Sequence, residues 1–298
     1  MIEDQFGELT ISRGKSLNYL GMNLDFSNAG KVKVTQDGFI QDFLKDMDGV
    51  IDGTKTYPAT KDLFKIGESE ILDISKKEFF HSTVARLLYL AKRTRPDLLL
   101  SISYLAKRVQ QPNQDDLGKL ERVVKYLRGT EKMGIILEAD KILNIVAYID
   151  ASHAVHDNHR SHSGTIITLG KGPIYQKSSS QKINTKSSTE SEIVALSDNS
   201  SQVIWTRNFL LSQGYKVEPA IIYQDNTSTM SLVKNGKSNS ERTKHISTRF
   251  YFIKDRVDNF EIKIEHMRTT EMIADILTKP ITGALFLKLR ELLMNWPT

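Results

Sequence analysis

The second half of the chain alternates between extended and helical patterns in an order that few folds accommodate. Five segments have the short apolar runs typical of strands, at 143–150, 164–170, 173–179, 219–225 and 260–267. Helical spacing separates or follows them, at about 188–212, 226–236 and 243–258 and from about Thr270 onward. This order of three strands, helix, strand, two helices, strand and helix predicts an α/β fold, with a mixed sheet and helices packed against it.

The first 140 residues follow a different pattern. Residues 16–35 are predicted to form two short strands, SLNYLGMNLDF and KVKVTQ, joined by a turn at Asn28–Gly30. A short helix from Phe39 to about Met47 follows, and then three amphipathic helices over 75–92, 97–109 and 115–129. The first of these three begins with a capping box, Ser75 with Glu78. We therefore predict two domains, 1–140 and 141–298, the first ending in a helical bundle.

Composition narrows the class of protein. With 39% hydrophobic and 26% charged residues, the chain has enough apolar side chains for a buried core. The absence of cysteine excludes disulfides and thiol catalysis, and is consistent with a reducing compartment. No apolar run reaches the roughly 20 residues of a membrane span, and the first ten residues are no signal peptide. We expect an intracellular protein, cytoplasmic or nuclear, that is neither secreted nor associated with a membrane.

Positive charge is concentrated in the three predicted helices. Residues 86–132 contain 11 Lys and Arg against 5 Asp and Glu, whereas residues 1–85 contain 10 against 14. Such a basic stretch suits a surface that contacts nucleic-acid phosphates, but a solvated helix face explains it equally well. The candidates for contact with a nucleic-acid backbone are Arg86, Lys92, Arg93, Arg95, Lys107 and Arg108.

Four acidic residues stand beside apolar neighbours on four different elements. Asp150 and Asp225 each end a strand, Glu192 lies near the start of the long helix, and Asp275 lies early in the last helix. If the four converge on one face of the sheet, their mutual repulsion predicts bound divalent metal. Each of them alone also fits a structural role, as a helix cap, a dipole partner or a turn residue.

Several longer motifs resemble one known family. The segments YIDASHAVHDNHRSHSG, SSQKINTKSSTESEIVAL, YQDNTS, RTKHISTRFYFIKD and IADILTKP occur in the order seen in the ribonuclease H domain of copia-type LTR retrotransposon polyproteins. Upstream, NYLGMNLDF resembles the end of the reverse transcriptase palm, around the primer-grip hairpin. The stretch from VARLLYLAKRTRPDLLLSISYLAKRVQQP to KYLRGT resembles the segment that joins the two. The resemblance implies a ribonuclease H-like mixed sheet with flanking helices, preceded by a palm remnant and a helical connection.

The resemblance also implies an activity. The catalytic and metal-binding carboxylates of the family fall on Asp150, Glu192, Asp225 and Asp275. They imply two Mg²⁺ ions, with Mn²⁺ as a possible substitute, and cleavage of the RNA strand of an RNA–DNA hybrid. Glu190, two residues from Glu192, is expected on roughly the opposite side of the helix as a dipole partner. Ser188, Thr189 and Asn226 begin helices beside the carboxylates and are further candidates for nucleic-acid contact.

One motif of the family is absent. Polymerisation requires a YxDD sequence, and the pair Asp115–Asp116, which follows Gln114, does not match it. We therefore do not expect DNA polymerase activity. The alternative to a nuclease is a non-catalytic nucleic-acid-binding remnant of the polyprotein. Such a remnant would have exposed apolar faces, and its partner would be the rest of the reverse transcriptase or another copy of the chain.

The histidines and aromatic residues near these motifs have several interpretations. Four histidines recur every three residues, at His153, His156, His159 and His162. A zinc site is one interpretation, but a polar connection between strands near the substrate fits the turn-rich segment better. His245, in TKHIS, belongs to the family pattern without an assigned role. Trp205 and Phe209 are expected on the buried face of the long helix.

Overall fold

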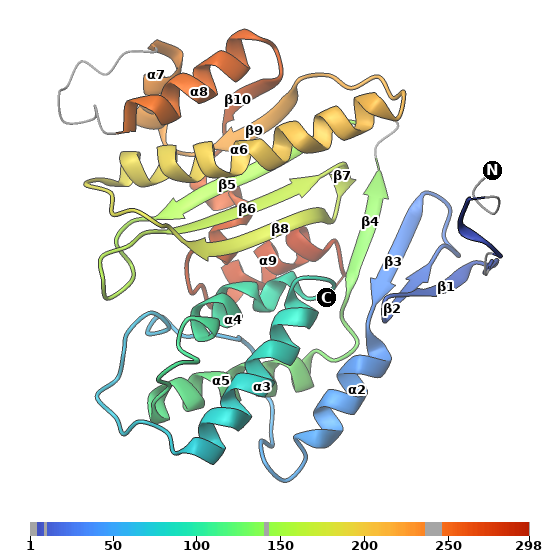
Figure 1. Cartoon of the computed structure of the whole chain (residues 1–298), viewed down its shortest axis with the longest axis vertical. Coiled ribbons are helices and arrows are strands. Elements are labelled where there is room, and N and C mark those ends of the chain that lie inside the picture. Colours follow the sequence, from blue (N-terminus) through green and yellow to red (C-terminus); the bar gives the residue numbers. More distant parts are fainter. Residues whose placement is uncertain (1–4, 9–10, 140–142, 236–245, 298) are drawn as a thin grey trace.

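The computed structural model describes residues 5–8, 11–139, 143–235 and 246–297. Two five-stranded sheets and the helices around them make up the molecule, and the helices of the N-terminal half lie on the far side of the second sheet from α6 (Ser188–Ser212) (Figure 1). The predicted boundary between residues 140 and 141 falls outside the described residues.

The first sheet is antiparallel and includes a segment from the second half of the chain. Its order is β1 (Ser16–Tyr19), β2 (Met22–Asp25), β3 (Lys31–Thr35), β4 (Ile135–Ala139) and β7 (Gly170–Lys171). The prediction of a single strand over SLNYLGMNLDF was wrong, because the chain reverses at Leu20 and Gly21, whose φ angles are 49° and 74°. A positive φ is readily adopted by glycine and fits a tight hairpin turn.

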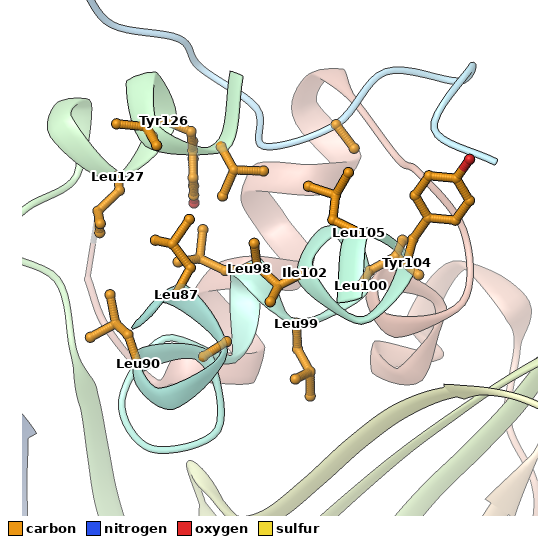
Figure 2. Packing of buried hydrophobic residues seen from close by; sticks show 14 of the residues in the cluster. Leu87, Leu90, Leu98, Leu99, Leu100, Ile102, Tyr104, Leu105, Tyr126 and Leu127 are labelled. Atoms are coloured by element: carbon orange, nitrogen blue, oxygen red, sulfur yellow. The ribbon is translucent and has the colours of Figure 1, made fainter. Parts of the chain in front are cut away.

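Helices α2 (Asp37–Asp46), α3 (Ile74–Ala91), α4 (Leu99–Ala106) and α5 (Gln114–Gly129) confirm the predicted helical part. A 3₁₀ turn, η1 (Pro96–Leu98), leads into α4. Asp73, and not Ser75, caps α3, because its side chain accepts a hydrogen bond from the Lys76 backbone N–H. Figure 2 shows how α3, α4 and α5 pack together around Leu87, Leu98 and Ile102, all of which are fully buried.

The second sheet is mixed, as predicted. Its order is β10 (Ile262–His266), β9 (Ala220–Gln224), β5 (Val146–Ser152), β6 (His162–Thr168) and β8 (Pro173–Ser180). Strands β5, β6 and β8 pair antiparallel, and β9 runs parallel to both β5 and β10. Helix α6 packs on one face, with α7 (Thr227–Asn235) and α8 (Ser247–Asp258) beside it (Figure 1). The predicted α/β class, a mixed sheet with flanking helices, is confirmed.

The C-terminal segment differs from its prediction. Two 3₁₀ turns, η3 (Thr269–Glu271) and η4 (Ile273–Leu277), stand where the last helix was expected to begin. The α-helix, α9 (Gly283–Met294), starts only after Pro280, which lacks the N–H that a helix interior needs. Phe286 and Leu289 of α9 pack into the same core as α3–α5. The end of the chain therefore completes the core of its N-terminal half.

Two aromatic side chains of α6 are more exposed than expected. Trp205 is 59% and Phe209 47% exposed, and their rings stack on each other with centroids 5.5 Å apart. The prediction that they lie on the buried face was wrong, since Val203 and Leu210 occupy that face.

Among the residues that the structure describes, no helix has the length and apolar content needed to cross a membrane.

Candidate metal centre

Three carboxylates from three elements meet at one edge of the second sheet. Asp150 lies on β5, Glu192 on α6 and Asp225 directly after β9, and one oxygen from each lies within 4.8 Å of the others. Asp150 and Glu192 are buried, with 1% and 5% exposure, and Asp225 is half-buried. The sequence brings them together because β5 and β9 are parallel neighbours in which Tyr148 pairs with Tyr223. Each aspartate follows two residues later, so both lie at the carboxyl ends of their strands.

Gln224 holds the Glu192 carboxylate and the backbone at Asp225, and Thr269 holds the Asp225 carboxylate. Nε2 of Gln224, at the end of β9, donates to Oε2 of Glu192 at 3.3 Å. Its Oε1 accepts from the backbone N–H groups of Asp225 and Asn226, at 2.9 and 3.1 Å. The hydroxyl of Thr269 donates to Oδ2 of Asp225 at 2.8 Å. Such bonds orient a carboxylate and prepare it for a metal ion.

The fourth predicted residue, Asp275, lies on η4 beside this group rather than within it. Nζ of Lys279 lies 2.6 Å from Oδ1 of Asp275 and 3.5 Å from Oδ2 of Asp150, so the ammonium joins the two carboxylates. The hydroxyl of Thr278 donates to the same Asp150 oxygen. Neither Thr278 nor Lys279 was identified from the sequence. The signal that could have found them is the LTKP run that directly follows IADI.

The negative charge of the clustered carboxylates is only partly balanced by Lys279. Burial and the neighbouring charges of Asp150 and Asp225 raise the pKa of the Glu192 carboxyl well above its ordinary value. Burial and Asp150 likewise raise the pKa of Asp275 to about 7, although Lys279 opposes the shift. Carboxylates with raised pKa values in close contact are stabilised by a cation, and carboxylate oxygens are the ligands that Mg²⁺ prefers. The residues present therefore fit a divalent metal ion.

Comparison with known proteins bears on identity. No protein-family model matches the chain. The Pol polyprotein of transposon RE2 from Arabidopsis thaliana is 35% identical over 209 residues, which are 70% of this chain and 14% of that protein. The Pol polyprotein of transposon TNT 1-94 from Nicotiana tabacum is 31% identical over 215 residues, 72% of this chain and 16% of that protein. The chain is homologous to copia-type retrotransposon Pol polyproteins. It spans only about one seventh of their length.

The solved structures that match are remote in sequence. LC11-RNase H1, isolated from compost, is 15% identical, with a TM-score of 0.36 over 46% of this chain and 94% of that one. RNase H1 from Halobacterium salinarum is 16% identical, with a TM-score of 0.32 over 45% of this chain and 94% of that one.

The structure separates Glu190 from the metal-binding candidates of this Pol homologue. Oε2 of Glu190 accepts from the Lys186 backbone N–H at 2.8 Å, while the Glu190 N–H donates to Oγ of Ser187, the N-cap of α6. The glutamate therefore stabilises the helix start. Glu192, half a turn further on, faces the sheet.

The neighbouring candidates for nucleic-acid contact have different surroundings. Ser188 is exposed and Thr189 half-buried in the first turn of α6. Oδ1 of Asn226 accepts from the Thr229 backbone N–H at 3.0 Å, so this side chain caps α7. Contact of the three with nucleic acid stays a prediction.

The basic candidates divide into one that was wrong and five that stay predictions. Arg95 is fully buried and forms a two-bond ion pair with Asp97, at 3.0 and 2.7 Å, so it does not reach a ligand at the surface. Arg86 pairs with Asp46, Arg108 pairs with Asp116, and Arg93 lies over the ring of Tyr89. Lys92 and Lys107 are exposed.

The four regularly spaced histidines are not brought together as one set. His156 and His162 are buried and contact each other, with Nε2 of the first 3.0 Å from Nδ1 of the second. Nδ1 of His153 lies 3.3 Å from the Thr185 hydroxyl, and His159 is exposed. Among the described residues, the group of three or more possible ligands is the carboxylate trio, without a histidine. His245 lies outside the described residues.

Proposed function

We propose that this chain is a divalent-metal-dependent endonuclease that cleaves the RNA strand of RNA–DNA hybrids. In this proposal it corresponds to the C-terminal reverse transcriptase and ribonuclease H region of a Pol polyprotein. The observation that carries the proposal is the convergence of Asp150, Glu192 and Asp225 within 4.8 Å, beside Asp275 and Lys279. The Pol homologues support it, because the four carboxylates stand in the motifs that resemble the family's ribonuclease H domain.

The residues of the site would divide the work as follows. Asp150, Glu192 and Asp225 would hold one ion, and Asp150 with Asp275 a second. Bound Mg²⁺ would supply an activated water and stabilise charge on the scissile phosphate. Gln224 holds Glu192, Thr269 holds Asp225 and Thr278 holds Asp150, so the oxygens are oriented before an ion arrives.

Polymerase activity forms no part of the proposal. The YxDD sequence is missing, and Asp116 has a structural role in the capping box of α5. Its carboxylate is fully buried and also pairs with Arg108. The predicted intracellular location stays a prediction.

Cleavage of a hybrid labelled separately on its RNA and DNA strands tests the proposal. With Mg²⁺ or Mn²⁺ we expect cutting of the RNA strand alone, with no product in chelator or from duplex DNA. Asp150→Asn removes one charge while nearly preserving shape, and is expected to abolish product. A folded protein that binds the hybrid in chelator and never cuts it with metal would contradict the proposal and favour a binding remnant.

A further inference from the structure

A hydrogen-bonded chain runs along one face of the second sheet, from the histidine segment to η4. Nε2 of His156 lies 3.0 Å from Nδ1 of His162, and Nε2 of His162 lies 2.7 Å from Oγ of Ser178 on β8. Oγ of Ser178 in turn donates to the backbone carbonyl of Leu277 at 2.7 Å. His162 is fully buried, and Ser178 and Leu277 are also buried, so the chain is shielded from water.

The direction of each bond follows from the last one. The single hydroxyl proton of Ser178 goes to Leu277, so toward His162 the hydroxyl accepts, and the proton lies on Nε2 of His162. Nδ1 of His162 is then an acceptor, and His156 donates to it from Nε2. Burial lowers the pKa of both imidazoles, so at pH 7 both are neutral and each has one defined tautomer.

Gly164 provides a second, independent contact between β6 and the segment formed by η4 and Thr278. Gly164 lies two residues after His162 on β6 and pairs directly with Asp150 on β5. A Cβ at Gly164 would lie 2.7 Å from the Thr278 methyl, 2.9 Å from Cβ of Leu277 and 3.0 Å from the Ala274 carbonyl oxygen. Only a residue without a side chain lets η4 lie this close, where Thr278 reaches Asp150.

His156, at the other end of the hydrogen-bonded chain, contacts the N-terminal half of the molecule. The ring of His156 packs edge-on against Phe64, with centroids 4.9 Å apart, and is stacked with Tyr104 of α4 at 6.4 Å. Oγ of Ser103, also on α4, lies 3.2 Å from Oγ of Ser178. The hydrogen-bonded chain from His156 to Leu277 therefore joins the N-terminal helices to η4, the segment that carries Asp275.

We propose that His162, with His156 and Ser178, positions η4, so that the helical part of the chain controls the placement of Asp275 beside Asp150. His162 and Gly164 together form the surface of β6 against which η4 packs. They are positioning residues, since neither contacts the carboxylates through a side chain. The inference rests on the proposed function, because it assigns Asp275 to the weaker of two ion sites.

Manganese binding to the free protein tests this inference without a nuclease assay. We expect one tighter ion, held by Asp150, Glu192 and Asp225, and a weaker one that needs Asp275. His162→Leu keeps apolar volume but loses both hydrogen bonds, and should weaken the second ion about tenfold while leaving the first unchanged. His162→Gln, whose amide supplies an NH2 donor group and a carbonyl acceptor, should restore most of the loss. His159→Asn is the matched control, since His159 is exposed at a positive φ that asparagine tolerates.

Ser178→Ala and Phe64→Leu extend the test to the two ends of the hydrogen-bonded chain, at η4 and at the N-terminal half. Each is expected to weaken the second ion in the same way, and Ser178→Ala keeps the test open if His162→Leu does not fold. Variants that melt at lower temperature but bind both ions with native affinity, well below melting, would overturn the inference and leave a purely structural role. A native protein that binds no Mn²⁺ would overturn the proposed function and this inference together. Native two-ion binding with unaffected variants overturns the inference alone.

Discussion

The ammonium of Lys279 lies 2.6 Å from Oδ1 of Asp275 and 3.5 Å from Oδ2 of Asp150, in the gap between two carboxylates from distant parts of the chain. The lysine acts as an internal cation in a cluster that otherwise contains only negative charge. Since its side chain is 36% exposed, it has room to turn outward when a metal ion takes its place.

Replacing Lys279 is expected to make the protein depend on metal for stability. Lys279→Met leaves Asp150 and Asp275 uncompensated, at a cost of about 1–2 kcal/mol in chelator after allowing for the partial exposure of the lysine. Added Mg²⁺ should recover the loss. Thermal unfolding with and without Mg²⁺ measures this, with Lys263→Met on the exposed part of β10 as control. Equal destabilisation with and without Mg²⁺ would argue against an internal cation.

Asp275 gives a pH dependence with a defined sign. Its pKa is raised from 3.8 to about 7, so the folded protein binds this proton more tightly than the unfolded chain does. The stability that this group contributes is present below about pH 4 and is lost as the pH rises toward 7. In chelator, Asp275→Asn should therefore lose less stability than the native protein between pH 4 and 7. Parallel stability curves for the two proteins would contradict this.

His156 has the opposite dependence. Burial and the nearby charges of Lys107 and Arg160 lower its pKa from 6.5 to about 4. The folded protein resists protonation that the unfolded chain accepts, so stability is complete above pH 6.5 and falls as the pH drops toward 4, by up to about 3 kcal/mol. His156→Gln should flatten this fall in a denaturant titration series, and His159→Asn should not. An unchanged slope in His156→Gln would rule out this histidine as the source.

The fold was largely predictable, and the site only in part. Apolar periodicity gave the order of the elements in the second half, because strands and helices have different repeats. It missed β4, which becomes a strand only by pairing with β3 and β7. Strand-end positions marked Asp150 and Asp225 as candidates to converge, but only the structure shows that their strands are parallel neighbours that end at one edge. The catalytic role of the four carboxylates stays a prediction.

Features that depend on tertiary packing were not accessible from the pattern. Charge density placed Arg95 among surface residues, although Asp97 and Thr130 hold it inside the core. Helical spacing did not show that Trp205 faces solvent, because both sides of α6 have apolar residues. Lys279 and Thr278 gain their importance only from contact with Asp150, 128 or more residues away.

Arg95 offers a test of the corrected assignment. Arg95→Met removes one partner of a buried ion pair and leaves Asp97 uncompensated, which is expected to cost about 3–5 kcal/mol of unfolding free energy. Affinity for an RNA–DNA hybrid, measured below the melting temperature, should be unchanged. Loss of hybrid affinity in folded Arg95→Met protein, with the native salt dependence also reduced, would show that the arginine contacts nucleic acid after all.

The rate of RNA-strand cleavage in the matched pair Glu192→Gln and Glu190→Gln is the most direct test of the carboxylate site. The two glutamates lie in one turn of α6 and both are replaced by glutamine, but only Glu192 faces Asp150 and Asp225. We predict that Glu192→Gln cuts at least about 100-fold more slowly than the native protein with Mg²⁺, while Glu190→Gln retains most of the native rate. Full activity in Glu192→Gln, or loss confined to Glu190→Gln, would contradict the metal centre described above.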